Sequence, residues 1–251
     1  MCVKRVPAPG TRINITDDEL TVDAAFLGFT ISPHEECAVE AAARLVETHG
    51  GEATVLTLGP AEAEAQLRHA VSVGMASAVL VAIDGRDWDP QRTARAITTA
   101  IMSIEADRGR FDLILFGNES ADSGGFQVGI RVAHALGRAM VNGAKGITVA
   151  DGFVRVRREA DAGQEMYELP IPAVVGVKEG INLPRYPTMK GRLASKRVDV
   201  LRLTAAGDAG GQRMIRLRRP AAQSSSTVVL GHGPDAAPAI VDLLERLGVL
   251  K

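Results

Sequence analysis

Short apolar runs alternate with longer amphipathic stretches through the first two thirds of this 251-residue chain. Three runs each stop at a turn-forming residue: Ala53–Leu58 before Gly59, Ala78–Ile83 before Asp84, and Phe111–Phe116 before Gly117. Short runs bounded in this way are typical of strands that are buried on both faces.

Residues at helical spacing lie between and around these runs, in His34–Thr48, Ala61–Val73, Asp89–Ala106 and Gln127–Leu136. Strands that alternate with helices in this way predict an α/β fold with a doubly wound, mostly parallel, Rossmann-like sheet.

The pattern changes after about residue 140. Further strands are predicted for Gly146–Ala150, Phe153–Arg158, Met166–Leu169, Ile171–Val177 and Lys196–Leu203, with a hairpin turn at Gly163. Between the last two of these strands, the proline-rich segment Asn182–Lys190 predicts an irregular loop.

The last part of the chain is too polar to form a core of its own. Thr204–Gly211 and Gln223–Ser226 are polar linkers, whereas Asp235–Leu250 predicts an amphipathic helix. Its expected inward residues are Ile240, Leu243, Leu244 and Leu247. We therefore expect an α/β domain of residues 1–203, followed by an arm and helix of residues 204–251. The arm is either disordered or lies on another protein, and the apolar helix at its end favours the second interpretation.

Composition excludes several classes of protein. The net charge is −1 and aromatic residues make up 4% of the chain, which argues against nucleic-acid binding. Two cysteines, Cys2 and Cys37, argue against a disulfide framework or a metal site. The opening residues lack the apolar stretch of a signal peptide, and no run reaches the ~20 apolar residues that span a bilayer. We expect a cytoplasmic protein without stable membrane insertion.

The loop after the predicted strand 111–116 is the first candidate binding site. It opens the helix 127–136 and consists of Gly117, Asn118, Glu119, Ser120, Ala121, Asp122, Ser123, Gly124, Gly125, Phe126, Gln127 and Val128. Ligands of open parallel sheets lie at the carboxyl ends of strands, and free amides at a helix start can hold a phosphate. The alternative is an ordinary loop with Asp122 or Ser123 as the helix N-cap.

Two other turns lie at the same predicted edge. Ser32 and Pro33 are typical of a helix start, with Glu35 as a capping-box residue, so structure alone explains them. His34 is more often a surface histidine than a ligand. Leu58 precedes a tight turn, which is either only a turn or a backbone segment that faces an adenine.

Residues 182–193 form a candidate docking loop. Met189 and Leu193 are predicted to be exposed apolar residues on a short helical turn, surrounded by basic residues, namely Lys190, Arg192, Lys196 and Arg197. An apolar tip with a basic surround suits docking into a partner's pocket. The alternative is a turn that faces the core with solvated charges around it.

No nucleophile–base pattern is present in the sequence. A nucleotide site without catalytic side chains indicates a carrier or a binding module rather than an enzyme with its own substrate.

Several ordered motifs resemble the β subunits of electron transfer flavoproteins, and the resemblance covers residues 1 to about 203. They are Cys2–Pro7, Pro33–Ala42, Gly59-Pro60 with Leu67–Ala70, the loop from Gly117 to Gly129, Arg158 to Gly163, Leu169–Val174 and Asn182 to Tyr186.

The resemblance implies a heterodimer with an α subunit that carries the redox FAD and passes electrons from a dehydrogenase onward. It implies that this chain binds AMP or a second FAD through Cys2, Ser32, Pro33, His34, Glu35, Leu58 and the loop 117–128. It also implies that residues 188–197 dock onto a flavin-dependent dehydrogenase, with Met189 as the anchor. The alternative function is a stand-alone adenine-nucleotide sensor.

Overall fold

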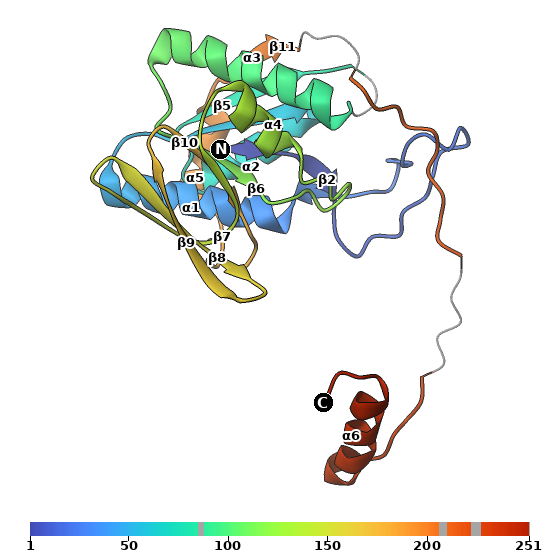
Figure 1. The fold of residues 1–251 in the computed structure, drawn as a ribbon. Coiled ribbons are helices and arrows are strands. Elements are labelled where there is room, and N and C mark those ends of the chain that lie inside the picture. Colours follow the sequence, from blue (N-terminus) through green and yellow to red (C-terminus); the bar gives the residue numbers. More distant parts are fainter. Residues whose placement is uncertain (85–87, 206–209, 222–226, 251) are drawn as a thin grey trace. The chain divides into compact units, whose positions relative to one another are not determined.

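A computed structural model describes residues 1–84, 88–205, 210–221 and 227–250. These residues form two compact units, residues 1–217 and residues 218–251 (Figure 1). The predicted linkers Thr204–Gly211 and Gln223–Ser226 fall largely outside the described residues.

The first unit contains a parallel sheet of four strands. Its strands are β1 (Cys2–Val3), β4 (Thr54–Gly59), β5 (Ser77–Ala82) and β11 (Val200–Thr204), in the order β1-β4-β5-β11. A short antiparallel ribbon of β2 (Arg5–Pro7) and β3 (Phe29–Ile31) leads into the first helix.

A second sheet has the order β6-β10-β7-β8-β9. Its first three strands, β6 (Leu113–Gly117), β10 (Ala173–Val177) and β7 (Met140–Ala150), are parallel. The strands β8 (Phe153–Ala160) and β9 (Gly163–Pro170) continue it as an antiparallel meander. Because β1 contacts both β4 and β6, the parallel parts of the two sheets lie next to each other.

Helices cover both faces of these strands. The helices α1 (Pro33–His49) and α2 (Glu64–Ser72) share one core cluster with Val3, Val55 and Leu80, and the 3-10 turn η1 (Ala61–Ala63) precedes α2. On the other face, α3 (Pro90–Arg108) and α4 (Val128–Ala135) pack against Leu56 and Val79. Neighbouring strand residues therefore point to opposite cores, as period-two geometry requires, and the predicted doubly wound α/β fold is confirmed.

The helix α5 (Met189–Arg197) corrects two predictions. Met189 and Lys190 belong to this helix rather than to a loop, and the strand predicted from Lys196 begins only at Val200. The Thr188 side chain caps α5 by accepting from the Gly191 N–H (3.0 Å). A Cβ at Gly191 would lie 2.1 Å from the Ser72 carbonyl oxygen, so glycine permits α5 to pack closely on α2. The strand predicted from Gly146 also begins earlier, at Met140.

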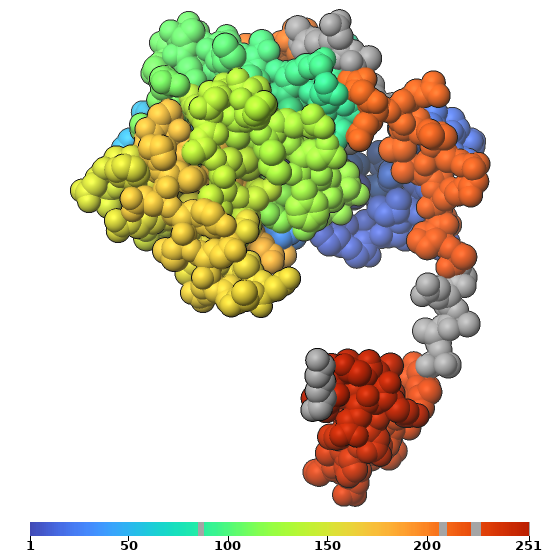
Figure 2. Space-filling model, viewed as in Figure 1, coloured from blue at the N-terminus to red at the C-terminus, as the bar shows by residue number. Residues whose placement is uncertain are grey.

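Residues 210–217 lie along the first unit. The Gly211 N–H donates to Gln91 Oε1 (3.2 Å), and the Leu217 N–H donates to the Glu19 carbonyl oxygen (2.6 Å). Figure 2 shows this segment, in orange, against the blue N-terminal loop.

The second unit contains the 3-10 turn η2 (Gly233–Ala236) and the helix α6 (Ala237–Arg246). The predicted amphipathic helix is therefore confirmed with shorter bounds. Of the residues expected to point inward, Leu243 and Leu244 are half-buried and Ile240 and Leu247 are exposed, so the described chain does not bury this face. Ile240 is 45% exposed and Leu247 is 66% exposed. None of the helices in the described part of the chain has the length and apolar character needed to cross a bilayer.

Candidate functional site

The first turn of α1 packs tightly against the end of β6. A Cβ added at Gly117 would lie 2.5 Å from Glu35 Cγ and 3.3 Å from His34 Cβ. Such a distance is too short for any side chain, so glycine at the strand end brings the start of α1 beside the loop 117–127. The predicted segments Ser32–Glu35 and Gly117–Val128 therefore meet at one edge of the sheet, where strands β1, β4, β6 and β10 end.

Glu35 is a buried carboxyl group at this contact, with 7% of its surface exposed. Its Oε2 accepts from the Lys4 N–H (2.9 Å). Burial raises the pKa of Glu35 to about 8, although backbone hydrogen bonds from Lys4 and Ser32 act in the opposite direction. The site thus contains a carboxyl group that holds its proton at neutral pH.

Asp122 ties the loop to the end of β1. Lys4 Nζ lies 2.5 Å from Asp122 Oδ2. Burial acts to raise the pKa of Asp122, but the charge and hydrogen bond of Lys4 outweigh it and lower this pKa overall. Sequence reasoning missed Lys4 as a site residue, although a cation directly after the first strand was the available signal.

Ser32 and His34 contact the loop through Glu119. Ser32 occupies the N-cap position of α1, as predicted, but its side chain makes no capping hydrogen bond. The Ser32 hydroxyl instead donates to the Glu119 carbonyl oxygen (3.3 Å). His34 Nε2 lies 3.5 Å from Glu119 Oε1, and His34 Nδ1 accepts from the Glu179 N–H (2.8 Å).

The start of α4 has no side-chain cap. Gln127 occupies the N-cap position without capping, and its Oε1 accepts from Arg131 Nη2 (3.1 Å). The alternative in which Asp122 or Ser123 caps this helix is therefore wrong. Gly124 has a φ of +54° and Phe126 a φ of +52°, so the loop turns sharply just before α4. The first amides of an uncapped helix, preceded by two glycines, can bind an anion such as a phosphate.

The other predicted site residues lie around this loop. Cys2 is buried in the core beneath α3, where burial raises the pKa of its thiol to about 11, so only its backbone can face a ligand. Leu58 lies at the end of β4, beside β1. Ser120 and Ser123 form a hydroxyl pair (2.8 Å) within the loop, Phe126 is 48% exposed, and Val128 is the first residue of α4. Among the described residues, no group of His, Cys, Asp or Glu side chains is placed to hold a metal ion.

The proposed docking residues lie on α5. Met189 is 74% exposed and Leu193 is 55% exposed, and the basic residues Lys190, Arg192, Lys196 and Arg197 are exposed as well. The alternative in which Met189 and Leu193 face the core is therefore wrong. Arg68 Nη1 donates to the Ser195 carbonyl oxygen (2.5 Å), which fastens α5 to α2.

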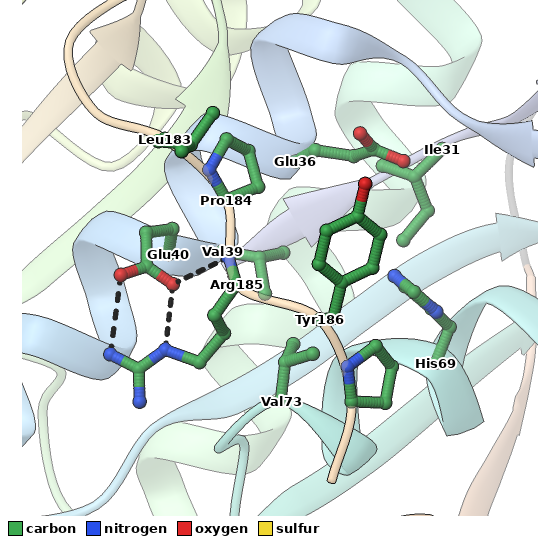
Figure 3. Close-up of a pocket in the computed structure, with 11 residues that line it drawn as sticks. Ile31, Glu36, Val39, Glu40, His69, Val73, Leu183, Pro184, Arg185 and Tyr186 are labelled. Atoms are coloured by element: carbon green, nitrogen blue, oxygen red, sulfur yellow. Dashed lines mark hydrogen bonds and ion pairs between the residues drawn. The ribbon is translucent and has the colours of Figure 1, made fainter.

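A groove of about 250 Å³ lies beside α5, between α1 and the segment 183–187. Figure 3 shows its lining, with the Arg185 side chain directed at Glu40 and the Tyr186 ring between Glu36 and His69. Arg185 Nε donates to Glu40 Oε2 (2.7 Å), and Glu40 is 3% exposed. This ion pair holds the segment that precedes α5 on the side of α1.

Known proteins match the chain over most of its length. A family model described as the electron transfer flavoprotein domain matches residues 20–208. The chain is 35% identical over 210 residues to an electron transfer flavoprotein subunit beta of Mycobacterium leprae, which covers 81% of this chain and 77% of that protein. It is 30% identical over 263 residues to the electron transfer flavoprotein subunit beta of Megasphaera elsdenii, and this match covers 98% of this chain and 96% of that protein. It is 31% identical over 216 residues to Protein FixA of Azorhizobium caulinodans, covering 84% and 75%.

The variant Glu35→Gln should remove a pH-dependent loss of stability. The pKa of Glu35 in the folded protein, about 8, lies above the ordinary value of 4.5. The stability that Glu35 contributes to the folded state is therefore fully present below pH 4.5 and is lost as the pH rises through about 8. Glutamine stays neutral, so the unfolding free energy of the variant should rise relative to wild type between these pH values, by roughly 4 kcal/mol. Urea unfolding at several pH values measures this difference.

Glu47→Gln serves as the control, because the Arg185 hydrogen bond lowers the pKa of Glu47. The difference in unfolding free energy between Glu47→Gln and wild type should stay constant between about pH 5 and 8. If the difference in unfolding free energy between Glu35→Gln and wild type does not change with pH over the same range, the assignment of a protonated Glu35 is contradicted.

Proposed function

The chain belongs to the electron transfer flavoprotein β subunit family, and from this premise we propose that it binds an adenine nucleotide at the loop 117–128 and pairs with an α subunit that carries the redox FAD. The heterodimer takes electrons from a flavin-dependent dehydrogenase and passes them to a downstream acceptor. The observation that carries the proposal is the close contact of the start of α1 with Gly117 at the end of β6, where the loop that leads to the uncapped start of α4 begins.

The nucleotide is AMP or a second FAD, because both present an adenosine phosphate. The backbone amides of Gly125 and the first turn of α4 are suited to the phosphate. Ser32–Glu35 and the backbone at Cys2 and Leu58 lie at the same edge of the sheet and are suited to the adenosine. The Lys4–Asp122 ion pair holds the loop in place beside them.

The FAD of the α subunit supplies the redox chemistry when it is bound. This chain supplies binding, orientation and electrostatics, and the nucleotide in its own site has a structural role. We further propose that the heterodimer is cytoplasmic.

The helix α5 is the proposed contact with the dehydrogenase. Met189 and Leu193 stand four residues apart, so they share one face of the helix. Lys190, Arg192, Lys196 and Arg197 surround this face with positive charge. An exposed apolar pair within a basic rim suits a partner that offers an apolar pocket with an acidic margin.

Residues 204–251 are the proposed contact with the α subunit. The apolar face of α6 is exposed in its own unit, and Val249 beside it is 66% exposed. A helix with one apolar face needs a surface to cover it, and a companion subunit is the surface that this family provides.

Ending the chain at Leu217 should remove the second unit and abolish stable pairing with the α subunit, because the apolar face of α6 is lost. Nucleotide binding should persist, because the loop 117–128 belongs to the first unit. Size-exclusion chromatography of the mixed subunits and titration with AMP and with FAD measure the two properties.

Leu247→Asp in the full chain tests the same face with one substitution, and Asp242→Ala on the opposite side of α6 is its matched control. Pairing should weaken with the first and persist with the second. Full pairing by the truncated chain would refute the role of this segment.

Met189→Glu should slow reduction of the heterodimer by its dehydrogenase by about tenfold or more, because it places a charge at the centre of the apolar contact. Nucleotide content should not change, since α5 lies away from the loop 117–128. Stopped-flow reduction by a purified flavin-dependent dehydrogenase measures the rate. Met102→Glu is the control, because Met102 is 57% exposed on α3, on the other face of the sheet. Equal rates for the Met189 variant and wild type would remove the docking assignment.

A further inference from the structure

The segment that leads to α5 is fastened along α1 at three successive points. The Glu179 N–H donates to His34 Nδ1 (2.8 Å), and Asn182 Nδ2 donates to the Cys37 carbonyl oxygen (2.9 Å). Arg185 then pairs with Glu40. Each contact lies three residues beyond the previous one on both partners, so the segment 179–185 follows α1 in register.

The last of these contacts joins a half-buried arginine to a buried carboxylate. Burial acts to raise the pKa of Glu40, but hydrogen bonds from Arg185 and Arg44 outweigh it and lower this pKa. Arg185 also pairs with Glu47 two turns further along α1 (Nη2–Oε2, 2.9 Å). Bidentate arginine–carboxylate pairs fix geometry as well as energy. Because α5 begins four residues after Arg185, the position of the docking helix depends on α1.

His34 stands at the first of the three points and also touches the nucleotide loop. Its Nδ1 accepts a hydrogen bond from the Glu179 N–H, so the proton of the neutral ring is on Nε2. Nε2 lies 3.5 Å from Glu119 Oε1. The His34 side chain is 16% exposed, so the ring is largely enclosed between these two groups. One imidazole therefore joins the loop 117–128 to the segment 179–185.

We propose that His34 is a positioning residue that couples nucleotide binding at the loop 117–128 to the order of the docking segment 179–197. This inference rests on the proposed nucleotide site and adds a role for its occupancy. A nucleotide that holds the loop restricts Glu119, Glu119 orients the Nε2–H of His34, and the fixed ring orients Nδ1 toward the Glu179 N–H. The segment 179–185 is then ordered along α1 as far as Arg185, and the helix α5 follows it.

The coupling has a reciprocal consequence. We call the contacts of His34 with Glu119 and with the Glu179 N–H the His34 bridge. If nucleotide binding orders the segment 179–197 by a given factor through this bridge, then loss of the bridge must weaken nucleotide binding by the same factor. Coupling through a few hydrogen bonds is expected to reach about fivefold or more.

Hydrogen exchange of the purified heterodimer, followed by mass spectrometry, tests the proposal with AMP and with FAD as added probes. In the wild type, nucleotide should slow exchange in residues 179–188 about fivefold or more. In His34→Phe, which keeps an aromatic ring without polar atoms, this nucleotide-dependent change should disappear. The affinity for the nucleotide should fall by the same factor.

Two further variants break one side of the bridge each. His34→Asn keeps an acceptor near the position of Nδ1 but is too short to reach Glu119, whereas Glu119→Ala removes the side-chain acceptor and keeps the backbone carbonyl oxygen that Ser32 contacts. Both should lose the coupling. His69→Asn is the matched control, because His69 is exposed on α2 beside the groove of Figure 3 and should leave the coupling intact.

The outcomes separate the inference from the function on which it rests. Failure of wild type to bind either AMP or FAD would overturn the nucleotide site, and the coupling with it. Wild-type binding together with the same nucleotide-dependent protection in His34→Phe and Glu119→Ala would overturn the coupling alone. Because Glu119→Ala leaves α1 unchanged, it tests the coupling even where a His34 variant folds poorly.

Discussion

The close approach of the α1 N-terminus to Gly117 determines what the rest of the structure can do. Only a residue without a side chain allows Glu35 and His34 to pack against the end of β6. That contact brings two helix starts, α1 and α4, to the same edge of the sheet. It also buries the Glu35 carboxyl beneath the loop, which raises the pKa of Glu35 to about 8.

The helix α1 connects the two proposed activities. Its first turn forms one wall of the proposed nucleotide site, and its side carries the segment that ends in α5. Both proposed roles fit the family, because an electron carrier must hold its cofactors and meet its donor. The His34 bridge gives this arrangement a physical path, from Glu119 through one imidazole to Glu179.

The strands and most helices of the first unit could be predicted because their apolar periodicity is strong. The run 53–58 and the stretch 34–48 gave β4 and α1 within about two residues of their observed bounds. The helix α5 was predicted only as a short helical turn that carries Met189 and Leu193, since its full length depends on packing on α2. Local sequence carries no information on a contact of that kind.

The segments that form the candidate site could be predicted from the sequence, but the side-chain contacts between them could not. The segments 32–35 and 117–128 were identified from turn residues and from the resemblance, yet Lys4 was missed because its partner Asp122 lies 118 residues away. The prediction that Ser32 occupies the N-cap position is confirmed, but its hydroxyl donates to the Glu119 carbonyl oxygen instead of capping the helix. The inward face expected for α6 stays a prediction, because amphipathicity predicts that a face will be covered but not by which chain, and no residue of α6 is buried in the described chain.

The nucleotide content of the purified heterodimer tests the central claim most directly. Denaturing the complex and quantifying the released nucleotides by mass spectrometry should show one adenine nucleotide in addition to the FAD of the α subunit. That extra nucleotide is either AMP or a second equivalent of FAD. A heterodimer that releases a single equivalent of FAD and no other adenine nucleotide would contradict the account.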